Sequence, residues 1–256
     1  MFLNNQKDNS NDKHENKKLL LNKRGNNDSF KVHFRHFLLE IRALLSHPAA
    51  IMLIFAGGLE SGINTSWSAV LQDMLRPIDL SDSLIGYIGF AVAVASMIGS
   101  MLMGPISDHF FRKRLKKLLL ILLVGGILSF AVAFAMLPSP FWTYGLFIDE
   151  LQHASQFQSR FVIVLCVAMC IGFFSGAMVP VFFEFVAEIC YPVSEGSSGM
   201  CLVFCNSVMS LLIVGTGSWL NTRFETLLAL TILLVCCFIT LSVKEVYQRD
   251  AVGKSF

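Results

Sequence analysis

The sequence predicts an all-α, polytopic membrane protein with six transmembrane helices, and three observations carry this prediction. Of its 256 residues, 54% are hydrophobic and only 15% are charged, whereas soluble domains are about 25% charged. Six apolar segments reach the length of about 20 residues that a helix needs to cross a bilayer. The alternating segments of about 10 residues that a β-barrel requires do not recur along the chain. The six segments are roughly 49–72, 84–106, 118–137, 161–187, 198–220 and 226–243.

The regions outside these segments are polar and differ among themselves. Residues 1–32 are rich in Asn, Lys and Asp, which predicts a disordered cytosolic segment. Residues 33–47 place their apolar side chains on one helical face, which predicts an amphipathic helix at the membrane interface. The six-helix transmembrane domain is expected over 48–243, and 244–256 is a cytosolic tail.

The basic residues set the expected orientation. Of the 20 lysines and arginines, 17 lie in residues 1–47, the second loop and the tail, and the other three are Arg76, Arg160 and Arg223. Cytosolic loops carry the excess of Lys and Arg. An integral multi-pass protein with both termini in the cytosol is therefore expected.

Polar side chains within the apolar segments are the candidate functional groups, because an ionisable group at bilayer depth is costly. Glu60, Asn64 and Trp67 are spaced i, i+4 and i+7, so they share a helical face. They are candidates for solute binding or proton transfer, and the alternative is helix packing through Gly58 and Gly62. Asn206 is an isolated amide that either bonds a neighbouring helix or lines a solute path.

Two carboxylates in the fourth segment lie near its cytosolic end. Glu184 and Glu188 follow Pro180 at successive i+4 positions and share one face. Neighbouring carboxylates repel when both are ionised, so one can carry a proton. The alternative is a charge latch with basic residues at the cytosolic surface.

Several functional classes are excluded. The seven cysteines form no CxxC pair, and no histidine stands at zinc-ligand spacing, so neither a metal nor another cofactor is expected. No HExxH or GxSxG motif is present, so the chain is not expected to be an enzyme. The net charge is only +2, and membrane topology accounts for the basic loop, so no nucleic-acid partner is expected.

The stretch Gly104 to Arg114, GPISDHFFRKR, resembles the signature of the major facilitator superfamily. His109 and Phe111 depart from the usual pattern. The resemblance implies that Asp108, Arg112 and Arg114 form a breakable charge latch between conformations.

Residues 180–199, PVFFEFVAEICYPVSEGSSG, resemble the fourth helix of the C-terminal half in the feline leukaemia virus subgroup C receptor-related family. The chain is thus similar to a C-terminal six-helix half of a major facilitator fold. The resemblance implies transport of a small organic solute, choline-like or pyridoxine-like, by alternating access. It leaves open whether this transport is coupled to protons. It also implies solute contacts for Trp67, Asn64 and Asn206, and an N-terminal half or partner chain to complete the carrier. The alternative function is a non-transporting half that acts as a membrane interaction or regulatory protein.

One short motif concerns localisation. Glu15, Leu19 and Leu20 fit the acidic dileucine pattern of lysosomal sorting signals, and chance accounts for so short a match equally well. A lysosomal and a plasma-membrane location therefore both remain open.

Overall fold

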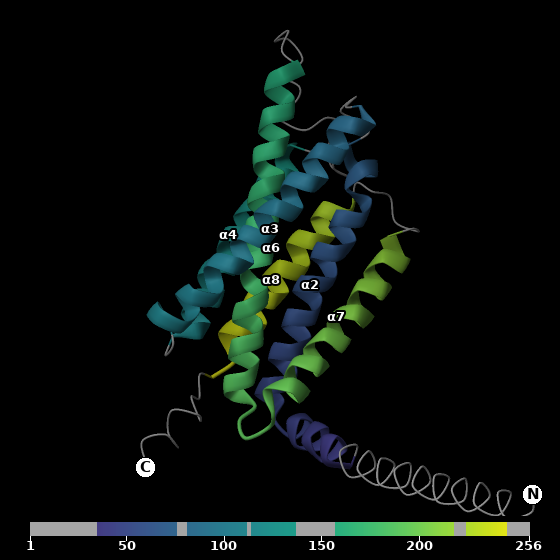
Figure 1. Ribbon diagram of the computed structural model, residues 1–256. Helices are drawn as coiled ribbons and strands as arrows, with labels where there is room; N and C mark the ends of the chain where they lie inside the picture. The colour runs from purple at the N-terminus through teal and green to yellow at the C-terminus, as the bar shows by residue number, and fades with distance from the viewer. Residues whose placement is uncertain (1–34, 76–80, 112–113, 137–156, 218–223, 245–256) are drawn as a thin grey trace, which may run out of the picture. The chain divides into compact units, whose positions relative to one another are not determined.

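The computed structural model describes residues 35–75, 81–111, 114–136, 157–217 and 224–244, and all regular secondary structure within these ranges is helical. The predicted sorting signal of Glu15, Leu19 and Leu20 lies outside the described residues, and so does the predicted latch residue Arg112. Six long helices follow one another along the chain (Figure 1): α2 Pro48–Leu75, α3 Asp82–Phe110, α4 Leu115–Met136, α6 Phe157–Ile189, α7 Glu195–Gly217 and α8 Glu225–Ser242. Each of them overlaps one of the six predicted segments, which confirms the predicted all-α class.

The chain divides into two units, Met1–Ala43 and Leu44–Phe256. A short helix, Arg35–Leu45, precedes α2. Within the first unit, His36 Nδ1 lies 3.3 Å from Glu40 Oε1. The interfacial position of this helix stays a prediction.

Five of the six long helices are long and apolar enough to cross a membrane by themselves. Helix α2 meets the joint requirement of length and mean hydropathy only when the preceding helix Arg35–Leu45 is counted with it. The reason is composition, because α2 carries a run of polar side chains in its second half, from Glu60 to Asp73. Helix α2 is also the one that holds three of the four candidate solute-binding residues, Glu60, Asn64 and Trp67.

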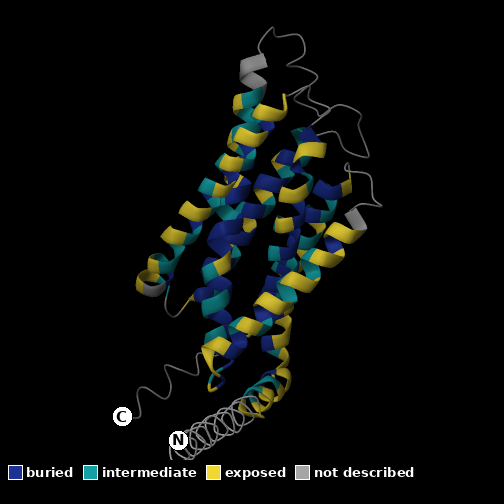
Figure 2. Cartoon of the chain, turned by 45° about the vertical axis from the view of Figure 1, so that its right-hand side comes forward, coloured by how far each residue is buried: buried dark blue, intermediate teal, exposed yellow. Residues whose placement is uncertain are grey.

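The second unit is built around α2 and α6. Figure 1 shows α2 between α7 and α8, and it packs against both. Helix α6 packs against α3 and α4, while α8 also contacts α4. Figure 2 shows the buried residues on the parts of the helices that turn toward one another and the exposed residues on their outer sides. Many exposed side chains are large and apolar, among them Phe90, Met101 and Leu211, as expected for surfaces that face lipid.

Glycines allow the closest helix contacts. A Cβ added to Gly176 of α6 would lie 2.1 Å from the Ser96 backbone oxygen of α3, and one added to Gly99 would lie 2.3 Å from the Phe173 oxygen. Between α2 and α7, the added Cβ of Gly58 would lie 2.5 Å from Cys205 Sγ. Small residues at helix interfaces let backbones approach, and this drives association in membranes.

One end of the bundle, here called the basic end, contains the end of α3, the start of α4 and the end of α8. Lys116 Nζ at the start of α4 donates hydrogen bonds to the backbone oxygens of Leu241 (2.8 Å) and Val243 (2.6 Å). The last carbonyl groups of a helix have no partner inside that helix, and they carry partial negative charge. Lys116 therefore fastens the end of α8 to α4.

Replacing Lys116 by Met is expected to lower the free energy of unfolding by about 1–3 kcal/mol, since hydrogen bonds to a charged group are lost. Lys117→Met is the matched control, because Lys117 is exposed. Unfolding in detergent can be followed with a thiol-reactive fluorophore. Buried Cys190 is a suitable reporter. Burial, and to a smaller extent the neighbouring Cys201, raises the pKa of its thiol to about 11, so this thiol reacts slowly until the protein unfolds. Equal melting temperatures for the two variants would contradict the assignment.

Candidate functional site

A set of polar side chains follows one face of α2. An added Cβ at Gly57 would contact Phe182 of α6 at 3.1 Å and Leu202 of α7 at 3.2 Å, so this face points toward α6 and α7 near the basic end. Residues four, seven, eight and eleven positions further along lie on the same face. They are Ser61, Asn64, Thr65 and Ser68, of which Thr65 and Ser68 are exposed and the other two are partly buried.

Helix α7 contributes polar groups to the same region. An added Cβ at Gly199 would contact Phe183 of α6 at 3.2 Å, and Asn206 and Ser210 follow seven and eleven residues later on that face. Both are partly buried. An added Cβ at Gly62 of α2 would lie 3.1 Å from the Ser210 backbone nitrogen, so the two helices are in close contact here. These six side chains, Ser61, Asn64, Thr65 and Ser68 with Asn206 and Ser210, are called the polar face below.

Local hydrogen bonds orient the side chains of the polar face. Thr65 Oγ1 donates to the Ser61 carbonyl and Ser68 Oγ to the Asn64 carbonyl, both at 2.9 Å. Ser210 Oγ donates to Asn206 Oδ1 at 3.2 Å. Back-bonding of hydroxyls to the preceding turn satisfies the donors and leaves the oxygen lone pairs as acceptors. The polar face thus combines hydroxyl acceptors with the amide groups of two asparagines.

Glu60 and Trp67 lie apart from the exposed part of this face. They are 1% and 2% exposed, respectively. Trp67 packs edge-on against Phe130 of α4, with ring centroids 5.6 Å apart. Sequence spacing groups these two residues with Asn64, whereas the structure buries both within the bundle and leaves Asn64 partly exposed. Packing of the neighbouring helices buries Glu60 and Trp67 but not Asn64, and sequence spacing alone does not reveal this packing.

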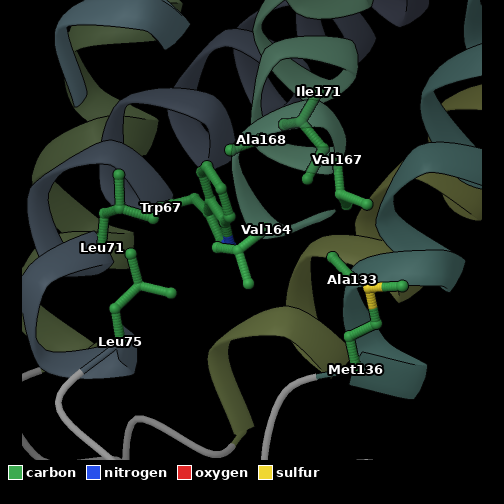
Figure 3. A pocket seen from close by; sticks show the side chains of 9 residues that line it. All are labelled: Trp67, Leu71, Leu75, Ala133, Met136, Val164, Val167, Ala168 and Ile171. Atoms are coloured by element: carbon green, nitrogen blue, oxygen red, sulfur yellow. The ribbon is translucent and has the colours of Figure 1, made fainter. Parts of the chain in front are cut away.

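Trp67 borders a small pocket, with a cavity volume of about 20 Å³, between α2, α4 and α6 (Figure 3). The other lining side chains are apolar: Leu71, Leu75, Ala133, Met136, Val164, Val167, Ala168 and Ile171. The indole Nε1 has no hydrogen-bond partner, although its residue is buried. Among its lining residues, the pocket has one hydrogen-bond donor, the Trp67 indole N–H, and no charged group. It therefore offers few hydrogen-bond partners to a polar solute.

Of the predicted latch residues, Glu184, Glu188 and Arg114 are described at the basic end. Ser107, one residue before Asp108, donates a hydrogen bond from its Oγ to Glu184 Oε2, which joins α3 to α6. Ser107 is fully buried, while Glu184 and Glu188 are partly buried. Arg114 is exposed directly before α4. The structure thus brings Glu184 next to the segment that resembles the major facilitator signature.

Several of these residues have no signal that composition or spacing could isolate. Ser61, Thr65, Ser68 and Ser107 are small hydroxyl residues, which are common in membrane helices for packing alone. Their roles can be assigned only when the neighbouring helices are known, because Gly57 shows which face of α2 meets α6 and α7 and Glu184 is the partner of Ser107. Among the residues that the structure describes, no group of three or more His, Cys, Asp and Glu side chains is placed to hold a metal ion.

Comparison with known proteins identifies relatives among transporters. The chain is 27% identical over 216 residues to a "Solute carrier family 49 member 4 homolog" of Xenopus tropicalis, covering 82% of this chain and 43% of the relative. It is 25% identical over 211 residues to the "Choline/ethanolamine transporter FLVCR1" of Felis catus, covering 82% and 34%. It is 27% identical over 188 residues to the "Choline/ethanolamine transporter flvcr2b" of Danio rerio, covering 73% and 34%. The chain spans less than half the length of these relatives. No family model matches the chain.

Proposed function

The chain is a relative of solute carrier family 49 and of the choline/ethanolamine transporters of the major facilitator superfamily, and from this we propose that it forms one wall of a carrier for a small organic solute. The observation that carries the proposal is the polar face. Thr65 and Ser68 are exposed in the second half of α2, and the five helices that accompany α2 are each apolar enough to cross a membrane. The hydroxyl donors are satisfied within the helices, but the side-chain amides of Asn64 and Asn206 also need partners, and an amide group left without one in hydrocarbon costs roughly 1–3 kcal/mol. The polar face therefore faces a water-filled path rather than lipid.

The second wall of the path is a further six-helix half. Solute sites in this fold lie between two halves that rock against each other. The match covers only 43% and 34% of these two relatives, which leaves room for such a half in a longer protein. We assign the chain to the C-terminal half, with both termini in the cytosol and the basic end on the cytosolic side. Phe183 of α6, which lies against Gly199 and is partly buried, then borders the path on that side.

The chemistry of the polar face supports a small solute with hydroxyl or amino groups, such as pyridoxine, choline or ethanolamine. Because Ser210 already donates to the Asn206 carbonyl, the Asn206 amide NH2 can donate to a solute oxygen. The hydroxyl oxygens of Thr65 and Ser68 can accept from a solute donor. At the basic end, Glu184, Glu188, Asp108, Arg112 and Arg114 act as a latch that opens when the halves move.

The proposal is tested by reconstituting the protein in liposomes and measuring uptake of labelled pyridoxine, choline and ethanolamine. The chain is tested alone and extended by any coding sequence that lies upstream in its transcript. Uptake above empty liposomes, saturable and competed by unlabelled solute, is the expected result for the form with two halves. A two-half form that neither binds nor carries any of the three solutes would overturn the proposal.

A further inference from the structure

Glu60 is a fully buried carboxyl group in the middle of a membrane-spanning helix, 1% exposed. Within the six helices, lysine, arginine and histidine occur only in the first or last turns, at His109, Lys116, Lys117 and Arg160. An ionised Glu60 would thus be a buried charge without a cationic partner in the bundle, at a cost of several kcal/mol. The buried side chain therefore holds a proton in this conformation.

The helices packed against α2 bring thiols and aromatic rings to this level. Cys236 of α8 donates from its Sγ to the Ala56 carbonyl at 3.3 Å, one turn before Glu60. Helix α7 presents Cys205 to Gly58, and α6 presents Phe182 to Gly57. The acidic residue that α3 brings to α2, Asp82, bonds Gln72 at the opposite end of the bundle, 3.4 Å away. Cys236 and Cys205 are therefore the titratable groups facing this part of α2 among the residues described.

Ser61 connects this buried carboxyl to the polar face. Its Oγ donates to Glu60 Oε2 at 3.4 Å, a long and weak hydrogen bond. Its own carbonyl accepts from Thr65 Oγ1 at 2.9 Å. Ser61 is only partly buried, so the same side chain touches the buried carboxyl and borders the path.

We propose that Glu60 is the proton-carrying group of the carrier, and that the Ser61 hydroxyl passes the proton between Glu60 and the polar face. This inference rests on the proposed function. When the path is open, the Ser61 hydroxyl turns its hydrogen from Glu60 toward a water molecule in the path, and the Glu60 carboxyl transfers its proton to the Ser61 oxygen as that hydroxyl hydrogen moves to the water. Glu60 is left as the carboxylate, and the reverse transfer restores the neutral group before the helices close around it.

Proton coupling is measured in liposomes with an imposed pH gradient and a trapped pH-sensitive dye. Glu60→Gln keeps the shape and polarity of the side chain and removes the titrating group. It is expected to retain solute exchange at equal pH and to lose both gradient-driven accumulation and solute-linked proton movement. Ser61→Ala is expected to slow proton movement, and Ser61→Thr, which restores a hydroxyl, to recover it.

Glu225→Gln is the matched control, since Glu225 at the start of α8 is equally buried, at 1% exposed. It is expected to keep the coupling of the unmodified protein. Solute-linked proton movement that persists in Glu60→Gln would overturn the proposal.

Infrared difference spectroscopy separates this inference from the proposed function. Protonated carboxyl bands that change with pH are expected in the unmodified protein, and because Glu225 is also buried, the band of Glu60 is the component that Glu60→Gln loses and Glu225→Gln keeps. If no solute is carried yet this band titrates, the carrier proposal fails and the proton site stands. If solute is carried and the band is unchanged in Glu60→Gln, the proton site fails and the carrier stands.

Discussion

Gly176→Ala is expected to lower the stability of the bundle by about 1–3 kcal/mol, the range for overpacking a close contact. The added Cβ would lie 2.1 Å from the Ser96 backbone oxygen and 2.5 Å from its Oγ. Backbone atoms of a helix cannot move aside as a flexible side chain can, so α3 and α6 must separate. The measurement is the melting temperature in detergent, which shifts by about 2–4 °C per kcal/mol for a protein of this size.

Gly89→Ala in α3 is the matched control, because no atom lies within 4 Å of its added Cβ. Alanine is the better helix former by about 0.8–1 kcal/mol, so this variant is expected to be unchanged or slightly more stable. The two identical chemical changes thus have opposite expected signs. A Gly176→Ala protein as stable as Gly89→Ala would show that α3 and α6 do not pack as closely as described.

Asn206→Leu is expected to reduce solute transport at least about tenfold, since losing a hydrogen bond of about 1.4 kcal/mol or more to a bound polar solute has that effect. Leucine is close in size to asparagine and suits a membrane helix, so the fold should persist. Thr65→Val removes the exposed hydroxyl of the facing helix at nearly constant shape, and a smaller loss is expected. Initial uptake rates over a range of solute concentrations separate weaker binding from slower transport.

Ser207→Ala serves as the control for Asn206. Ser207 is exposed, its hydroxyl bonds the Val203 carbonyl at 2.9 Å, and it points about 100° away from Asn206 around α7. Trp67→Phe is expected to leave the solute concentration for half-maximal uptake unchanged, because Trp67 lies inside the bundle against Phe130. If Trp67→Phe weakens uptake and Asn206→Leu does not, the solute lies in the pocket of Figure 3 rather than on the polar face.

The helices were predictable because their signal is local. Each predicted segment is an apolar run of sufficient length, and its ends are marked by charged or turn residues that cannot enter hydrocarbon. Helix α6 runs through Pro180 as a single helix. The resemblance of residues 180–199 to a transporter family could also be recognised from the sequence, because it rests on contiguous residues. The similarity of the chain to transporter relatives confirms it.

The candidate site was predictable only in part. Spacing placed Glu60, Asn64 and Trp67 on one face of α2, and that is correct as helical geometry. Spacing does not reveal which helix lies against each side, so it could not separate Trp67, packed on Phe130, from Thr65, which is exposed. The bond between Ser107 and Glu184 joins residues 77 positions apart, and no local pattern predicts it.

By itself, the sequence determined that this chain enters a membrane, where the long helices of the described residues lie and which kind of transporter it is similar to, since these follow from hydropathy and from contiguous motifs. The tertiary structure decided which side of α2 is polar and open, and that Ser61 lies between Glu60 and that side. The physical reason is that burial and hydrogen bonding depend on the neighbours that packing brings, and the glycines at positions 57, 58, 62 and 199 fix those neighbours by allowing α2, α6 and α7 to approach closely.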